Sequence, residues 1–140
     1  MIARLLMLLC LARLPLCADA EQDITAVVST LASALSGHNP ELFMKTLDRD
    51  MPVYQQIDRE IHALLSATDV ACTVEVLTNA GTPSVQTADL DWYMSLKSQQ
   101  DENLIERRRT KVTIKIEKRG KKWLVTSFSP ISVFAAMTAR

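Results

Sequence analysis

Apolar residues recur at a helical spacing in three segments of the first half of the chain. The clearest stripe consists of Ile24, Val27, Val28, Leu31 and Leu35. The segments 39–41 (NPE) and 50–52 (DMP) each combine a capping side chain with a proline, which is typical of a helix start. The pattern predicts a first helix that ends near Gly37, a short second helix after Pro40 and a third helix that ends near Asp69.

Beyond Asp69 the apolar period changes to two, which indicates half-buried β-strands. The four alternating runs are residues 72–77, 88–97, 111–117 and 123–129. Turns are predicted around Gly81 and Gly120, and a polar loop is predicted over residues 98–103. Helices followed by consecutive strands indicate an α+β fold. We expect three N-terminal helices packed on one face of a curved four-strand antiparallel meander.

One choice of hairpin register places the apolar residues of all four strands on the same face. The predicted pairs are Cys72 with Leu90, Leu90 with Val112, Trp92 with Thr110, Val112 with Phe128, and Ile116 with Leu124. The inner face then consists of even-numbered residues: Cys72, Val74, Val76, Ala88, Leu90, Trp92, Met94, Thr110, Val112, Ile114, Ile116, Leu124, Thr126 and Phe128. A slip of one residue would turn the set toward water, so the pattern specifies the register.

The densest run of charge, residues 107–122, holds nine basic residues and one acid. In the predicted register its odd-numbered members point away from the core, so that Arg109 lies opposite Tyr93 and Lys111 lies opposite Asp91. Charged side chains on the wet face of a strand are the ordinary pattern, and opposite charges across strands contribute about 0.2–1 kcal/mol each. We therefore interpret the run as the outer face of a strand, and we expect no nucleic acid as a partner.

The first twenty residues have the anatomy of a secretory signal peptide. A basic residue precedes a short apolar run, and Ala18-Asp19-Ala20 supplies small residues where cleavage is expected, after Ala20. The run is far shorter than the about 20 residues that a membrane span requires. The alternatives are a buried N-terminal helix and a lipoprotein anchored through Cys17. We expect residues 21–140 to form a single secreted or periplasmic domain without a membrane span.

Cleavage would leave Cys72 as the one cysteine of this domain, so no internal disulfide is expected. The domain would hold fourteen basic and fifteen acidic residues, because Arg4, Arg13 and Asp19 leave with the signal. The sequence contains no metal-binding, phosphate-binding or nucleophile motif. We expect no cofactor and no metal ion, and we interpret Cys72 as a small buried residue of a strand.

Two segments carry a resemblance to a known superfamily. Residues 31–40 (LASALSGHNP), together with Phe43, form a helix, a short turn and a Phe-bearing helix, and residues 120–125 (GKKWLV) form a closing Gly-x-x-Trp strand. These features resemble the nuclear-transport-factor-2-like, or cystatin-like, superfamily, an α+β cone. Its members include ketosteroid-isomerase-like and polyketide-cyclase-like enzymes and small secreted proteins. The resemblance implies a ligand cavity between the helices and a concave sheet. Residues 47–69 depart from it, because they indicate helix where this fold usually has a hairpin.

The expected cavity supplies candidate ligand-binding residues but no catalytic residue. The candidates are Tyr54, His62, Trp92, Met94, Arg108, Thr110 and Phe128. Acid–base catalysis needs ionisable groups inside such a cavity. The predicted inner face has no carboxylate and no histidine, and only Glu106 and Arg108 approach it, near the loop end of the sheet.

Two functions fit these observations. The first is a secreted, non-catalytic domain that binds an apolar small molecule or a protein partner, and the lack of acid–base groups on the inner face favours it. The alternative is an isomerase- or cyclase-like enzyme that uses Tyr54, His62, Glu106 or Arg108. A homodimer through the outer sheet face is a further hypothesis, because the pattern turns three apolar or aromatic residues outward: Tyr93, Trp123 and Val125.

Overall fold

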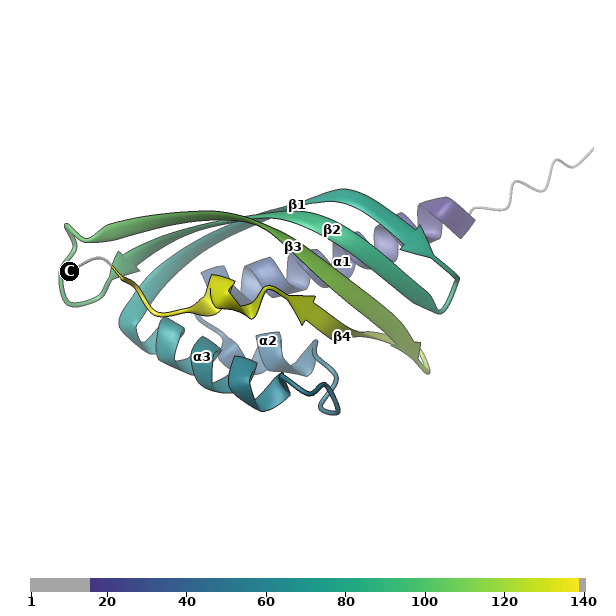
Figure 1. Cartoon of the computed structure of the whole chain (residues 1–140), viewed down its shortest axis with the longest axis horizontal. Coiled ribbons are helices and arrows are strands. Elements are labelled where there is room, and N and C mark those ends of the chain that lie inside the picture. Colours follow the sequence, from purple (N-terminus) through teal and green to yellow (C-terminus); the bar gives the residue numbers. More distant parts are fainter. Residues whose placement is uncertain (1–15, 139–140) are drawn as a thin grey trace, which may run out of the picture.

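The structure, a computed structural model, describes residues 16–138. Three helices, α1 (Leu16–Ser36), α2 (Pro40–Lys45) and α3 (Tyr54–Ala67), precede the strands β1 (Thr68–Gly81), β2 (Val85–Ser98), β3 (Ile105–Arg119) and β4 (Lys122–Ser129). A 3-10 helix, η1 (Ile131–Phe134), follows the last strand. The strands form an antiparallel sheet in the order β1-β2-β3-β4. The sheet is arched, and the helices lie on its concave side (Figure 1), so the predicted α+β architecture is confirmed.

The turn between α1 and α2 follows the local sequence closely. The Asn39 side chain accepts a hydrogen bond from the Leu42 N–H at 3.1 Å, which caps α2 as predicted. The residue with a left-handed backbone is His38, with a φ of 59°, and not the neighbouring Gly37. Gly37 is required by space instead, since a Cβ at this position would lie 2.9 Å from the Ser33 carbonyl oxygen.

The central hairpin has the predicted register, with Leu90 opposite Val112. The first hairpin differs, because Cys72 lies opposite Met94 and not opposite Leu90. The reason is that β1 continues through the expected turn to Gly81 and joins β2, which begins at Val85, through residues 82–84. The displacement is an even number of residues, so the even-numbered side chains of β1 share a face with those of β2 as far as Val76, where the register shifts at Leu77.

The last hairpin corrects two predicted pairs. Ile116 lies opposite Val125 and not Leu124, and Phe128 lies opposite Ile114 and not Val112. The register shifts where Thr126 is an extra residue in β4, a β-bulge that reverses the inward and outward alternation before it. Val125, predicted to face outward, is therefore fully buried. The simple period-two pattern could not reveal a bulge at this position.

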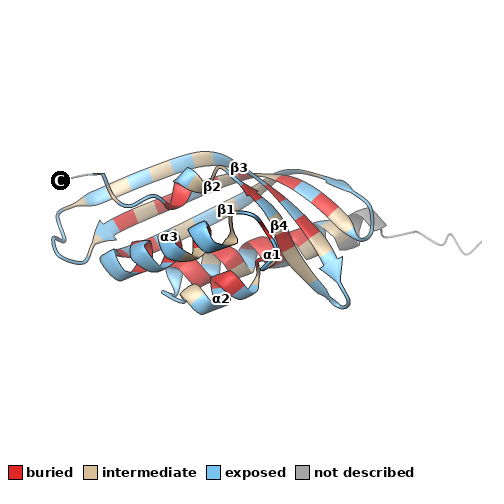
Figure 2. Ribbon diagram, turned by 60° about the horizontal axis from the view of Figure 1, so that its bottom comes forward, coloured by how far each residue is buried: buried red, intermediate tan, exposed pale blue. Residues whose placement is uncertain are grey.

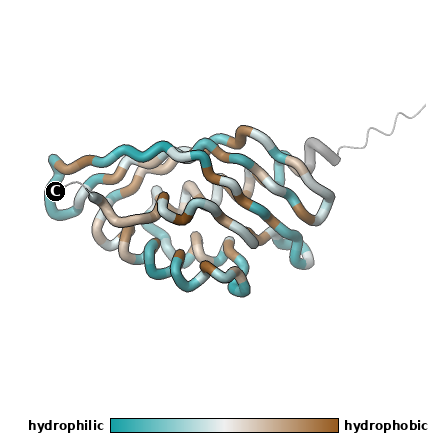
Figure 3. Tube along the Cα trace, in the orientation of Figure 1, coloured by the Kyte–Doolittle hydropathy of each residue, from teal (hydrophilic) through white to brown (hydrophobic). Residues whose placement is uncertain are grey.

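The core lies between the concave sheet face and the helices (Figure 2). Figure 3 shows polar and apolar residues alternating along the strands, which leaves the convex face polar. Four aromatic rings fill the centre of the core. Trp92 packs edge-to-face on Phe128 and Phe134, with ring centroids 5.4 and 5.9 Å apart, and Phe43 packs edge-to-face on Phe134 at 5.4 Å. All four side chains are at most 4% exposed.

Opposite charges line the convex face, where the basic run of β3 was predicted to lie. Arg109 Nη2 is 2.7 Å from Asp91 Oδ2, and Lys111 Nζ is 3.6 Å from Asp89 Oδ2. The hydrogen bonds from the Arg109 guanidinium hold the pKa of Asp91 below its usual value. The predicted outward orientation of these residues is confirmed, although each ion pair runs diagonally between the strands and not directly across.

Candidate binding groove

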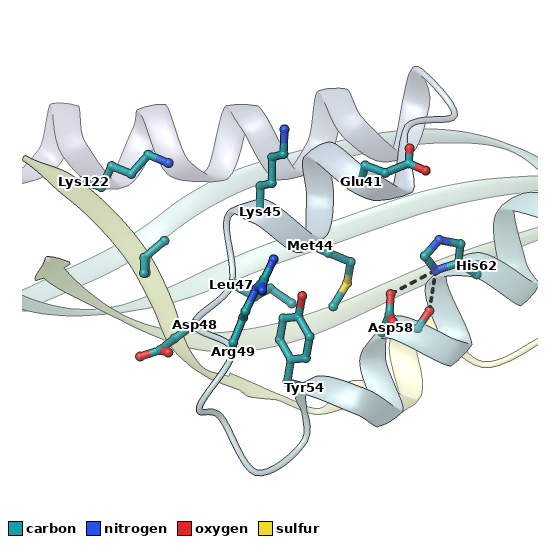
Figure 4. Close-up of a pocket in the computed structure, with 11 residues that line it drawn as sticks. Glu41, Met44, Lys45, Leu47, Asp48, Arg49, Tyr54, Asp58, His62 and Lys122 are labelled. Atoms are coloured by element: carbon teal, nitrogen blue, oxygen red, sulfur yellow. Dashed lines mark hydrogen bonds and ion pairs between the residues drawn. The ribbon is translucent and has the colours of Figure 1, made fainter.

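A groove of about 570 Å³ lies between α2, the segment that follows it, α3 and the start of β4 (Figure 4). Its lining residues are Glu41, Met44, Lys45, Leu47, Asp48, Arg49, Tyr54, Asp58, His62, Lys122 and Leu124. The volume falls within the range of about 300–1,000 Å³ that small-molecule sites usually have. We refer to this hollow as the α2–α3 groove.

The floor of the α2–α3 groove is apolar. Met44 and Leu47 are 6% and 3% exposed, and both belong to the core beneath the groove. The half-buried residues Tyr54 and Leu124 complete the apolar lining. An apolar floor that remains open to a ligand offers hydrophobic contact of about 25 cal/mol for each Å² that the ligand covers.

One end of the groove holds an oriented histidine. His62 Nδ1 lies 3.0 Å from Asp58 Oδ1 and 2.9 Å from the Asp58 carbonyl oxygen. The two residues are one turn apart on α3, so their side chains share a face of the helix. These contacts place the Nδ1 proton toward Asp58 and leave Nε2 without an intramolecular partner among residues 20–138, so Nε2 can contact a ligand.

The segment between α2 and α3 joins the groove to the sheet. The Val125 N–H donates to the Thr46 carbonyl, and the Asp48 N–H donates to the Val125 carbonyl, both at 2.8 Å. Leu47, between them, pairs with Val125 as an isolated parallel bridge. This pairing covers the outer edge of β4 and positions Lys122, at the start of that strand, on the groove.

The structure brings together two of the seven predicted ligand-binding residues, Tyr54 and His62. Trp92, Met94 and Phe128 are core residues instead. None of these three lines the α2–α3 groove. Thr110 is half-buried on β3, opposite Trp92, and does not line the groove.

Arg108, the seventh candidate, holds the C-terminal segment. Its guanidinium pairs with Glu106 and donates to the Val133 and Ala136 carbonyls, each at 2.9 Å. Glu106 in turn accepts from the Thr138 N–H at 3.0 Å. Burial would raise the pKa of Glu106, but the Thr138 and Arg108 hydrogen bonds outweigh it and leave the pKa below the usual value. These two residues therefore fix the segment that carries Phe134 into the core.

The interior has the apolar character that the sequence predicts. Among residues 20–138, the buried polar side chains are Thr68 and Gln86, and neither is ionisable. The Trp92 Nε1 atom is buried without a hydrogen-bond partner in this part of the chain. The described residues also contain no group of three His, Cys, Asp or Glu side chains that could hold a metal ion.

The three residues predicted for a dimer interface do not form one surface. Tyr93 is on the convex face of the sheet and is 36% exposed. Trp123 lines a hollow beside α1, together with Val27. Val125 is buried, so its predicted place on the outer face is wrong, because the bulge at Thr126 turns its side chain toward the core.

Sequence reasoning missed Asp58 and the three cations of the groove, Lys45, Arg49 and Lys122. The Asp-x-x-x-His spacing of Asp58 and His62 on a predicted helix was the available signal for the first. No comparable signal exists for the cations, because they come from α2, a loop and β4, and the pairing of residues 46–48 with β4 is what assembles them.

A second groove, between α1 and β1, contains Cys72. The Cys72 N–H donates to the Ser36 hydroxyl at 2.9 Å, so a side chain of α1 satisfies the backbone of the β1 edge. The Cys72 side chain is half-buried, and burial raises the pKa of the thiol to about 12. The thiolate, which is the reactive species, is therefore scarce at neutral pH.

We expect Cys72 to react slowly with iodoacetamide in the folded chain of residues 21–140. With a pKa of about 12, the thiolate fraction at pH 8 is about one in 10,000, so alkylation followed by mass spectrometry should be slow until the chain is unfolded with urea. A Thr73→Cys variant in a Cys72→Ser background is the matched control, because Thr73 is exposed on the same strand. Equal rates for the two cysteines would contradict the burial of Cys72.

No protein-family model matches the sequence, and the comparison with curated proteins finds no significant match. Solved structures do match. A conserved protein from Planctomyces limnophilus superposes with a TM-score of 0.72 at 6% identity, covering 79% of this chain and 94% of its own. A protein from Shewanella oneidensis described as nuclear-transport-factor-2-like, of unknown function, superposes with a TM-score of 0.59 at 10% identity, covering 78% and 96%. The protein has the nuclear-transport-factor-2-like fold.

A ketosteroid-isomerase-like protein from Erwinia carotovora shares this fold, with a TM-score of 0.64 at 8% identity and coverage of 76% of this chain and 91% of its own. Identities this low show a shared nuclear-transport-factor-2-like fold and not a shared activity. The predicted fold resemblance is confirmed. In this member of the fold, the aromatic cluster fills the space between helices and sheet.

Proposed function

We propose that the protein is a secreted, non-catalytic small-molecule-binding protein and that the α2–α3 groove is its site. The observation that carries the proposal is the open apolar floor of this groove, flanked by Tyr54 and by the oriented His62, beside an interior that aromatic rings already fill. A hollow of about 570 Å³ suits a small organic molecule better than the flat contact typical of protein partners. The ligand would place its apolar body over Met44 and Tyr54.

The spacing of the polar groups favours binding over catalysis. Tyr54 and His62 are eight positions apart on α3, which separates their Cα atoms by about 12 Å along the helix axis. A base and an oxyanion donor that act on neighbouring atoms must each come within about 3 Å of the reacting centre. Two groups this far apart are better suited to contact opposite ends of an elongated ligand.

An acid–base enzyme is the second candidate, and the Asp58–His62 pair favours it. Asp58 orients the imidazole, so that Nε2 could take a proton from a bound substrate. The test is conversion of a molecule that the protein retains. Loss of that conversion in His62→Gln would support the enzyme if the control variant His38→Gln kept it. His38 is a suitable control because it is an exposed loop residue outside the groove.

Secretion is supported by the signal-like first twenty residues and by the position of the core. The helix α1 begins at Leu16, and from residue 20 onward its first fully buried side chain is Ile24. Cleavage after Ala20 would therefore remove none of the core side chains that lie within residues 20–138. None of the helices within residues 16–138 has the length and apolar character needed to cross a membrane.

We expect the neutral probe N-phenyl-1-naphthylamine to bind the chain of residues 21–140 with increased fluorescence. The double variant Tyr54→Ser/Leu124→Ser removes half-buried apolar groups of the groove, so the dissociation constant should rise about tenfold or more, since 1.4 kcal/mol of lost contact is tenfold. Titration of wild type and variant measures this change.

The matched control is Leu77→Ser/Ile105→Ser, which removes two side chains that are each 50% exposed and lie outside the groove. It should bind the probe as wild type does. Equal weakening by both double variants, or no binding by wild type, would contradict the proposed site. Mass spectrometry of molecules retained by protein purified from a periplasm would then identify the natural ligand, and their loss in the groove variant would connect them to the site.

A further inference from the structure

We infer that the ligand of the α2–α3 groove is an organic anion, such as a carboxylate, sulfonate or phosphate monoester, whose charged group contacts Lys45, Arg49 and Lys122. This inference rests on the proposed function, and it adds the chemical class of the ligand. It is derived from the balance and the arrangement of charge around the groove.

The acids of the groove are mostly engaged by neighbouring groups. Asp48 Oδ2 lies 3.2 Å from Arg119 Nη2, and Asp48 Oδ1 accepts the Asp50 N–H at 2.9 Å. The Asp50 N–H, and then Arg119, lower the pKa of Asp48, so its charge persists and is already balanced by Arg119. Asp58 Oδ1 lies 3.0 Å from His62 Nδ1, a hydrogen bond that balances the carboxylate charge only when the imidazole is protonated. Glu41 is the acid of the groove that forms no ion pair within residues 20–138.

The bases of the groove are not engaged in this way. Lys45, Arg49 and Lys122 form no ion pair with any acid in the described part of the chain. They belong to the last turn of α2, the following segment and the first position of β4. The groove therefore holds three positive charges without an ion pair against the two negative charges of Glu41 and Asp58.

The positive charges are also separated from Glu41 and Asp58. Figure 4 shows Lys122, Lys45 and Arg49 from one end to the middle of the groove, and Glu41 with the Asp58–His62 pair at the other end. The basic part lies beside the apolar floor, where a bound ligand would exclude water and strengthen a charge contact. An apolar body with an anionic group at one end matches both features, and a neutral ligand matches only the floor.

A pair of matched probes tests the anionic group. 8-Anilinonaphthalene-1-sulfonate and N-phenyl-1-naphthylamine share the same aryl framework, and only the first carries a sulfonate. We expect Lys45→Ala/Arg49→Ala/Lys122→Ala to weaken the sulfonate probe about tenfold or more and the neutral probe less than about twofold. Raising NaCl from about 0.02 to 0.5 M should likewise weaken only the sulfonate probe, because salt screens exposed charges.

The control variant Arg107→Ala/Lys115→Ala/Lys118→Ala makes the same change in net charge, with three exposed bases that lie outside the groove. It should leave both dissociation constants near wild type. The inference would be overturned if both triple variants weakened binding of the sulfonate probe equally, or if the groove variant did not weaken it. Binding of the neutral probe in the groove would still support the proposed function in either case. If Tyr54→Ser/Leu124→Ser affected neither probe, the groove itself would be rejected, and both proposals with it.

Discussion

Replacing Trp92 with alanine is expected to lower the free energy of unfolding by about 3–5 kcal/mol, the usual cost of removing a large aromatic side chain from a core. Trp92 is fully buried and contacts both Phe128 and Phe134 edge-to-face, so the variant leaves a cavity and removes two aromatic contacts. Urea denaturation followed by circular dichroism measures the change. A loss of this size is a large part of the 5–15 kcal/mol that typically stabilises a whole domain.

Two further variants define the outcome of this experiment. Trp92→Phe keeps most of the packing and should remain folded with a smaller loss if Trp92→Ala fails to fold. Tyr93→Ala truncates the adjacent aromatic residue on the convex face, which is 36% exposed and therefore has less packing to lose than the fully buried Trp92. Similar losses for Trp92→Ala and Tyr93→Ala would mean that Trp92 lines an open cavity, as the nuclear-transport-factor-2-like resemblance alone implies.

Replacing Val125 with aspartate is expected to destabilise the protein by about 4 kcal/mol or more, because it places an unpaired carboxylate in the core. Val125 is fully buried, and its backbone is bonded to the segment after α2. Ser127→Asp is the matched control, because Ser127 is exposed on the same strand and should cost less than about 0.5 kcal/mol. Denaturant unfolding measures both changes.

The contrast between these two variants tests the bulge at Thr126. In an unbulged β4, Val125 and Ser127 would both face water, and aspartate would be tolerated equally at either position. Tolerance of Val125→Asp combined with a large loss for Thr126→Asp would show that β4 pairs in the simple register. A loss of stability in Val125→Asp but not in Ser127→Asp would establish the shifted register of β4.

The fold was predictable where local pattern and tertiary structure agree. The Asn39 cap and the pairing of Leu90 with Val112 depend on residue types at short range or on strict alternation, and both are present as predicted. The β4 register was not predictable, since a bulge inserts one residue without any change in composition. The continuation of β1 to Gly81 was not predictable either, because residues typical of turns, such as Asn79 and Gly81, can also be paired within a hairpin arm.

The site was predictable only in part, because it depends on contacts between distant segments. Tyr54 and His62 were identified individually, and their common helix face brings them to one groove. Trp92 and Phe128 were expected to line a cavity, but Phe134, in the 3-10 helix that follows β4, packs against both rings. Lys122 reaches the groove only because β4 pairs with the segment around Leu47.

The pairing of β4 with the segment around Leu47 also determines how far the groove must reorganise when a ligand binds. The segment between α2 and α3 is bonded to β4 on both sides of Leu47, so the floor of the groove is fixed before anything binds. A preformed floor avoids most of the loss of conformational entropy that occurs when a flexible loop becomes ordered around a ligand. The ligand would then bind to a rigid site, and its affinity would depend on how well its shape and charge fit the groove.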